Sequence, residues 1–97
     1  MLEKELERKF VNILRKKGCI VYKFVSPGNA GVPDRLVVTS KGTVHFAELK
    51  QKGKLLRPLQ VMQAKRLAKN HVKVHLVDSM EAIRAFLRKV MPNESDI

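Results

Sequence analysis

The sequence predicts an α/β fold in which a mixed four-stranded sheet is flanked by helices. Three observations predict it. Helical periodicity marks both ends of the chain and one internal segment, and four β-branched or aromatic runs lie between them. The first three runs follow one another through turns, whereas a helix separates the third from the fourth. A meander followed by a helical crossover combines antiparallel with parallel pairing, which gives the order αβββαβα.

The first helix is expected over residues 2–17. At about 100° per residue, Glu7 falls at the edge of its apolar stripe, and Glu3 lies one turn earlier. Gly18 supplies a stop for the helix. The stripe itself consists of Leu2, Leu6, Phe10, Ile13 and Leu14.

Three strands are expected next. The run "CIVYKFV" (19–25) ends in the turn-forming loop "SPGNAG". The runs "DRLVVT" (34–39) and "TVHFAELK" (43–50), separated by "SKG", are typical of a hairpin. Asp34 begins the first strand of this hairpin and Glu48 lies near the end of the second. Antiparallel pairing is therefore expected to bring the two carboxylates together.

The second half of the chain supplies the crossover and the closing elements. Pro58 suits the first turn of a helix over 58–69, and "VKVHLV" (72–77) is the fourth strand. The closing helix is expected over 78–91, where Asp78 and Glu81 have the spacing of a capping box, and the chain ends in the polar "PNESDI".

The closing helix carries a wider apolar face than one chain is expected to cover, which favours a dimer. That face consists of Met80, Ile83, Phe86, Leu87, Val90 and Met91. The sequence thus predicts one domain over residues 1–91 and a frayed tail over 92–97.

Charge makes nucleic acid the leading partner. The net charge is +11 and the pI about 10.2, while 44% of residues are hydrophobic. An anionic membrane surface is the rival, but neither end helix sets a basic face opposite bulky aromatics. No apolar run reaches the roughly 18 residues of a membrane span, and the charged start lacks a signal-peptide core. These features predict a soluble, intracellular protein without membrane contact.

The cysteine and histidines suggest no zinc site. A single Cys19 cannot form an internal disulfide, which fits a reducing cytoplasm, and it is expected to be a small buried apolar residue. The spacings of His45, His71 and His75 are not those of residues that would bind zinc together with Cys19.

Two isolated carboxylates interrupt the basic stretch. Between Arg8 and Val77 the only acids are Asp34 and Glu48, against sixteen Lys and Arg. A divalent cation prefers hard oxygen ligands and takes one or two carboxylates from protein. We therefore expect Asp34 and Glu48 to bind one, with the backbone carbonyl of Leu49 available as a further ligand.

Neighbouring polar side chains can complete such a site. Strand alternation puts Lys50 on the face of Glu48, roughly 7 Å along it, where it can orient or help deprotonate an attacking water and offset phosphate charge. Glu7 is a candidate outer carboxylate or second metal ligand, and Gln60 can hold the water or a phosphate oxygen. The simpler interpretations are a turn cap for Asp34, a solvated strand end for Glu48 and Lys50, and a salt bridge for Glu7.

The motif Pro33-Asp34, thirteen residues, then Glu48-Leu49-Lys50 resembles that of the PD-(D/E)xK nuclease superfamily. The longer stretches "GVPDRLVV" and "FAELKQKGKLLRPLQ" resemble the VRR-NUC family specifically, and the resemblance runs from Glu7 to about Val77. It implies a restriction-endonuclease-like αβββαβ core, Mg²⁺ or Mn²⁺ as cofactor, and hydrolysis of phosphodiester bonds in DNA. Stand-alone members of this size, often viral, are similar to Holliday-junction resolvases that act as homodimers.

The resemblance also assigns roles to individual residues. Asp34 and Glu48 match the metal ligands and Lys50 the catalytic lysine, while Glu7 and Gln60 match the helix-one glutamate and the later glutamine of the family. It implies an enzyme without an obligatory small-molecule cofactor, in the cytoplasm of a bacterial or virus-infected cell. Asn70 departs from the glycine common in the family before the last core strand, and asparagine tolerates the left-handed conformation.

The basic loop after the motif is the expected DNA contact. Lys52, Lys54 and Arg57 are candidates for binding phosphates, and Ser26 either contacts a phosphate or forms a turn. With five aromatic residues and no tryptophan, base stacking is not expected to dominate, which favours duplex or branched DNA. The alternative from another class is a non-catalytic nucleic-acid-binding module that uses the basic face alone.

Overall fold

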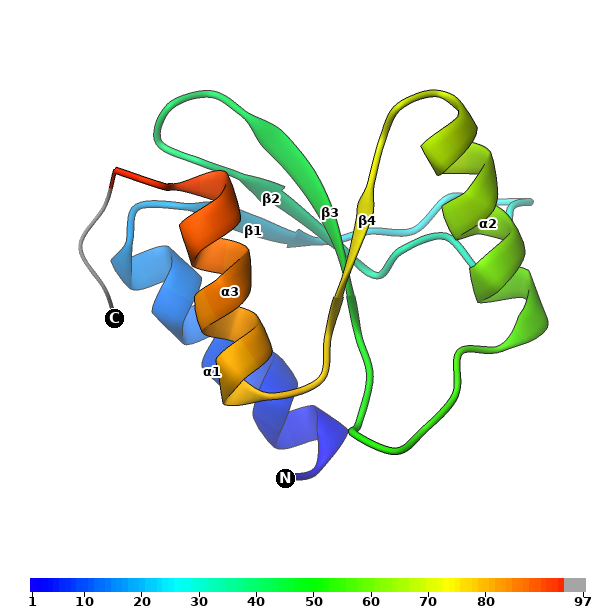
Figure 1. Cartoon of the computed structure of the whole chain (residues 1–97), viewed down its shortest axis with the longest axis horizontal. Coiled ribbons are helices and arrows are strands. Elements are labelled where there is room, and N and C mark those ends of the chain that lie inside the picture. The colour runs from blue at the N-terminus through cyan, green and yellow to red at the C-terminus, as the bar shows by residue number, and fades with distance from the viewer. Residues whose placement is uncertain (94–97) are drawn as a thin grey trace.

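The element order of the computed structural model is the predicted one, and the structure describes residues 1–93 (Figure 1). Expectations for residues 94–97 of the tail lie outside the described residues. The elements are α1 (Glu3–Lys16), β1 (Ile20–Lys23), β2 (Arg35–Val38), β3 (Val44–Leu49), α2 (Pro58–Lys69), β4 (Val74–Val77) and α3 (Met80–Val90). No helix within residues 1–93 combines the length and the apolar character needed to cross a bilayer.

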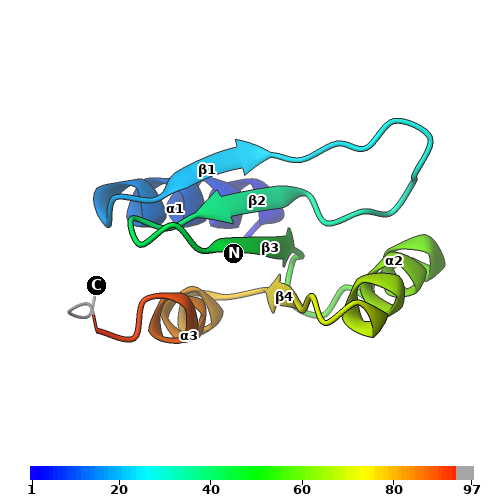
Figure 2. The same ribbon diagram turned by 90° about the horizontal axis from the view of Figure 1, so that it is seen from above.

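The sheet is mixed, as predicted, with the strand order β1-β2-β3-β4. Neighbours β1/β2 and β2/β3 are antiparallel (Figure 2), whereas β3 and β4 are parallel and run in the same direction in Figure 1. Arg35 pairs with Ala47 across β2 and β3. Because the pairing is antiparallel, Asp34, which directly precedes β2, comes opposite Glu48, which follows Ala47.

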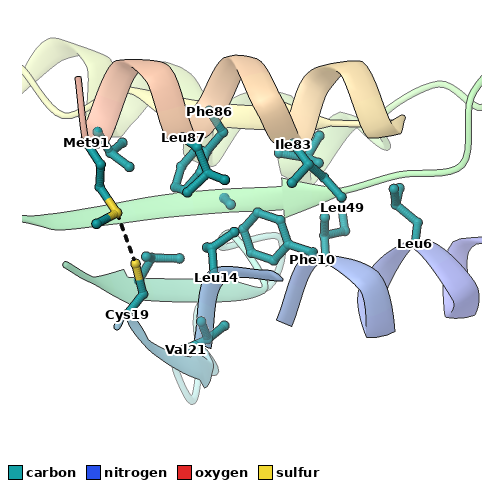
Figure 3. Packing of buried hydrophobic residues seen from close by; sticks show 14 residues of the cluster. Leu6, Phe10, Leu14, Cys19, Val21, Leu49, Ile83, Phe86, Leu87 and Met91 are labelled. Atoms are coloured by element: carbon teal, nitrogen blue, oxygen red, sulfur yellow. Dashed lines mark hydrogen bonds between the residues drawn. The ribbon is translucent and has the colours of Figure 1, made fainter. Parts of the chain in front are cut away.

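Helices α1 and α3 pack together on one face of the sheet, which we call the covered face (Figure 1). Figure 3 shows Phe10 and Leu14 of α1 against Phe86 and Leu87 of α3. Cys19 is 5% exposed, and its Sγ lies 3.5 Å from Met91 Sδ, so the expectation of a buried thiol is confirmed. The strand residues in this core are Val21, Val37, Ala47, Leu49 and Val77.

Two expectations for the closing helix are wrong. Its apolar face is not left for a partner: the core already buries Ile83, Phe86, Leu87, Val90 and Met91 and partly buries Met80. The apolar face of α3 is wide because it packs against α1 as well as against the sheet. The helix also begins one residue later than expected, so Ser79 is the N-cap in place of Asp78, and its Oγ accepts a hydrogen bond from Ala82 N at 3.1 Å.

The other side of the sheet, which we call the open face, is only partly covered. Helix α2 lies on this side, near the ends of the strands (Figure 1). Away from α2, Ile20, Tyr22, Val44 and Leu76 keep between 50 and 58% of their surface exposed. By strand alternation, Glu48 belongs to this face. An apolar surface and the candidate site therefore share one side of the sheet.

Candidate active site

Reciprocal hydrogen bonds join the two carboxylates at the end of the β2–β3 hairpin. Asp34 N donates to Glu48 Oε2 at 3.1 Å, and Leu49 N donates to Asp34 Oδ1 at 3.2 Å. Each carboxylate thus accepts an N–H group from the opposite strand. The predicted proximity of Asp34 and Glu48 is confirmed, whereas the ligand that they bind stays a prediction.

Gln60 fixes the second carboxylate from helix α2. Its Nε2 donates to Glu48 Oε1 at 2.7 Å, and its Oε1 accepts from Arg57 N at 2.7 Å. Gln60 is 8% exposed and Glu48 5% exposed. The amide therefore spans the first turn of α2 and orients the carboxylate, so Gln60 is not an exposed helix residue.

The electrostatics of the pair favour a positively charged ligand. Burial, with the nearby charge of Asp34, raises the pKa of Glu48 to about 7. Burial also raises the pKa of Asp34, and the charge of Glu7 adds to it. Lys50 and Arg57 oppose the shift at Glu48 but do not cancel it. Two desolvated carboxylates side by side ionise fully only if a cation joins them.

A divalent metal ion fits this donor set. Carboxylate oxygens are hard ligands, and each has a second lone pair beside the one that accepts a hydrogen bond. The Leu49 side chain is 1% exposed in the core, so only its backbone can offer a ligand. Within residues 1–93, no group of three or more Asp, Glu, His or Cys is arranged to hold a metal ion. A bound ion would therefore need backbone carbonyl, water or phosphate oxygens to complete its coordination.

Glu7 of α1 approaches the site from the covered face, and Glu3 contacts the chain just beyond it. Arg35 Nη2 donates to Glu7 Oε1 at 3.1 Å, with side-chain exposures of 15 and 27%. Glu7 therefore makes the salt bridge that its simpler interpretation predicts, yet it is close enough to affect Asp34. Glu3 Oε1 accepts from Gln51 N at 3.3 Å, just after Lys50.

Sequence reasoning missed Arg35 and Gln63. The charge of the Arg35 guanidinium opposes the rise in the pKa of Asp34 without cancelling it, and the Nε of Arg35 is buried without a hydrogen-bond partner among the described residues. Gln63, one turn after Gln60, is 7% exposed and donates to Ala30 O at 3.2 Å. A signal existed in both cases: Arg35 directly follows the aspartate of the motif, and Gln63 has helical spacing from Gln60.

The residues predicted to bind DNA differ in how directly they act on the carboxylate pair. Arg57 is the exposed N-cap of α2, and its charge acts on Glu48. Lys52 and Lys54 are exposed on the loop that leads to it, and no ion pair within residues 1–93 ties them to an acid. Ser26 Oγ accepts from Asn29 Nδ2 at 2.9 Å, so it serves as a turn residue in its own loop.

Comparison with known proteins places this geometry in a family. No protein-family model matches the chain. A phage protein named "Putative nuclease p44", from Acyrthosiphon pisum secondary endosymbiont phage 1, is 42% identical over 79 residues, covering 81% of this chain and 85% of the relative. A solved structure described as "VRR_NUC domain" superposes with a TM-score of 0.80 at 24% identity, covering 92% of this chain and 96% of the other.

The chain belongs to the VRR-NUC family. Its mixed sheet with three helices is the VRR-NUC fold. The motif that carried the resemblance, from Pro33-Asp34 to Glu48-Leu49-Lys50, is the segment that forms the reciprocal carboxylate pair. The family assignment supports a nuclease.

Proposed function

We propose that the chain is a Mg²⁺- or Mn²⁺-dependent PD-(D/E)xK endonuclease that hydrolyses phosphodiester bonds in DNA. The observation that carries the proposal is the hydrogen-bonded pair of a half-buried Asp34 and a buried Glu48, both with raised pKa values, inside a chain of net charge +11. Buried acids repel a DNA phosphate unless a cation neutralises them. A cation bound here is attracted both by the carboxylates of the protein and by the phosphate of the DNA.

Each residue of the site has a distinct task in this proposal. Asp34, Glu48 and the Leu49 carbonyl would hold the divalent ion, which supplies Lewis acidity to the phosphodiester when bound. Lys50 orients the attacking water, takes part in removing its proton, and offsets negative charge that develops on the phosphate. The water oxygen forms a bond to phosphorus as the bond to the departing sugar oxygen breaks, the water gives up its proton, and the sugar oxygen takes up one from solvent. Gln60 keeps the Glu48 carboxylate aimed at the ion.

The basic loop and the helix start would bind the DNA backbone. Lys52, Lys54 and Arg57 flank the carboxylates, with Ser26 on the facing loop, and their contacts to phosphate carry no base preference. Binding should therefore weaken steeply with salt. The proposed setting is the cytoplasm of a bacterial or virus-infected cell, which accords with a similar phage protein.

The proposal includes a homodimer that acts on four-way junctions. Symmetric cleavage of a junction needs two sites related by a two-fold axis. Because α3 is used inside the chain, the open face offers the interface: Ile20, Tyr22 and Val44 are exposed, apolar and uncharged. Sedimentation of the wild type at micromolar concentration should show a dimer and Tyr22→Asp a monomer. A wild type that sediments only as a monomer removes the dimer from the proposal.

The deciding experiment compares three proteins on plasmid and junction DNA with Mg²⁺ or Mn²⁺. Lys50→Ala should bind DNA within a few-fold of wild type yet lose cutting by about 10²–10³-fold, a typical loss for one charge-stabilising catalytic group. Lys41→Ala is the matched control, because Lys41 is exposed at the hairpin turn. Equal nicking by wild type and Lys50→Ala, or none by either protein, favours the non-catalytic binding module.

A further inference from the structure

A cavity of about 600 Å³ lies beside the carboxylates, between α2 and the loop that joins β1 to β2. Figure 2 shows this loop extending past the strands to the end of the molecule where α2 lies. Pro33 and Phe46 line the cavity, next to Asp34 and two residues before Glu48 respectively. Along a strand, two residues span roughly 7 Å, which is about the spacing of neighbouring nucleotides. The cavity is therefore about one nucleotide away from the candidate site.

The cavity wall has the chemistry of a nucleotide site. Phe24 and Phe46 supply aromatic rings, with centroids 5.1 Å apart in an edge-to-face pair. Arg66 and Lys69 supply positive charge, and no acidic residue within residues 1–93 lines the cavity. The volume is within the roughly 300–1,000 Å³ of ordinary ligand pockets. A flat, partly apolar ligand that carries negative charge fits this lining.

Polar groups on the wall can meet the edge of a base. Gln63 Nε2 donates to Ala30 O, and its Oε1 accepts no hydrogen bond from residues 1–93, so this oxygen can accept one from a ligand. The side chain of Asn70 lies at the exposed end of α2 and also lines the cavity. Asn29 donates to Ser26, and both residues line the opposite wall. Amide groups of this kind pair with the donor and acceptor edges of nucleobases.

The cavity is held in shape before any ligand arrives. Gly31 adopts φ +90°, and a Cβ there would lie 2.4 Å from the carbonyl oxygen of Leu59 in α2. Only glycine allows the loop to approach the helix so closely. Together with the hydrogen bond from Gln63 to Ala30, this contact fixes one wall against the other.

We propose that this cavity binds one unstacked nucleotide of the DNA next to the phosphate that is cut. The base enters between the loop and α2, against Phe24 and Phe46, while Arg66 and Lys69 neutralise its flanking phosphate. The inference rests on the proposed nuclease function and adds to it a requirement for local unstacking. Branch points, where bases unstack at little cost, are thereby favoured over continuous duplex.

The test uses four-way junctions that carry 2-aminopurine at each of the four nucleotides next to the branch point. Unstacking of this base raises its fluorescence, and calcium replaces magnesium so that the readout does not need turnover. Asn70→Trp fills the cavity from an exposed position, whereas Asn70→Ala leaves it open and serves as the matched variant. Circular dichroism of both variants should match wild type, because the Asn70 side chain is exposed.

Wild type and Asn70→Ala should raise the fluorescence at one labelled position, and Asn70→Trp should not. Loss of base stacking should weaken junction binding by about tenfold in Asn70→Trp. A second pair of variants tests the flanking phosphate: Arg66→Ala should weaken binding, whereas Lys65→Ala, on the same helix but outside the cavity lining, should not. Equal fluorescence and affinity of the two Asn70 variants overturns the inference.

The outcomes separate this inference from the proposed function. A wild type that cuts DNA without any fluorescence change keeps the nuclease and removes the nucleotide cavity. A fluorescence change that is lost only in Asn70→Trp, in a protein that never cuts with Mg²⁺ or Mn²⁺, keeps the cavity and removes the nuclease.

Discussion

Two pairs of titratable side chains lie near β3, and burial shifts their pKa values in opposite directions. At the end of the hairpin, burial raises the pKa of Glu48 to about 7, beside Asp34. On the covered face, burial, with Lys73, His45 and Lys89 adding to it, lowers the pKa of His75 to about 4. The His45 and His75 rings are 6.0 Å apart and both pack edge-on against Phe86. In each pair, desolvation favours the neutral form.

The two pairs differ in whether a partner can restore the charge. The histidines remain neutral near pH 7 and have lysines nearby. A cation would therefore find no negative charge there and would be repelled by the lysines. The carboxylates lie beside a basic loop and the start of α2, which can bind a phosphate. Because the pKa of Glu48 is near 7, a bound cation shifts this side chain to its ionised form. Burial alone therefore does not mark a functional site. A functional site is indicated instead by a buried charged group whose opposite charge must be supplied by a ligand.

The largest expected effect comes from neutralising the carboxylate pair. Glu48→Gln keeps the size of the side chain but removes a proposed metal ligand, so cutting should fall by at least about a thousandfold. His45→Gln makes a comparable change on the covered face and should leave cutting within about threefold. Cleavage rates on the same junction give the comparison. If Glu48→Gln retains a tenth of wild-type activity, the pair is not the reacting centre.

Metal removal should have a smaller, pH-dependent effect on stability. Because the folded pKa of Glu48 is raised, its contribution in the metal-free protein is fully present below about pH 4.5 and is lost as pH rises through about 7. A rise from 4.5 to about 7 corresponds to about 3 kcal/mol, which partial solvation of the carboxylate pair reduces to about 2 kcal/mol of unfolding free energy. Mg²⁺ or Mn²⁺ should restore that stability, so the Tm difference between metal-bound and metal-free protein should widen from pH 5 to pH 8.

The same titration in Glu48→Gln is the control for this effect. The variant cannot lose a proton at position 48, so its metal-free Tm should lack the corresponding decline and its response to metal should be small. A metal-induced rise in Tm that is equal at both pH values in wild type would contradict the linkage.

The hairpin was predictable because its geometry is local. The break "SKG" sets the register, and the register places Asp34 opposite Glu48, as the structure confirms. The closing helix shows where this reasoning stops. Periodicity identifies an apolar stripe on α3, but it does not tell whether α1, the sheet or a second chain covers it.

The missed residues depend on contacts between distant segments. Arg35 meets Glu7, 28 residues away, and Gln63 meets Ala30, 33 residues away. Their positions in a strand and a helix were predictable, but their partners follow from how α1 and the β1–β2 loop pack. The roles of Glu7, Gln60 and Lys50 in catalysis stay predictions, since geometry shows only where these side chains lie.

The smallest expected effect lies in the histidine pair. A folded pKa lowered from 6.5 to about 4 means that the unfolded chain binds more protons below pH 6.5. Stability from neutral His75 is thus present above about pH 6.5 and is lost as pH falls toward 4. Because the ring is partly exposed, we expect a loss of about 1 kcal/mol in unfolding free energy. His75→Gln should flatten the decline between pH 6.5 and 4 in urea unfolding, whereas exposed His71→Gln should not. Parallel curves for the two variants would show that the burial of His75 has no thermodynamic consequence, and the contrast with the carboxylates would then rest on Glu48 alone.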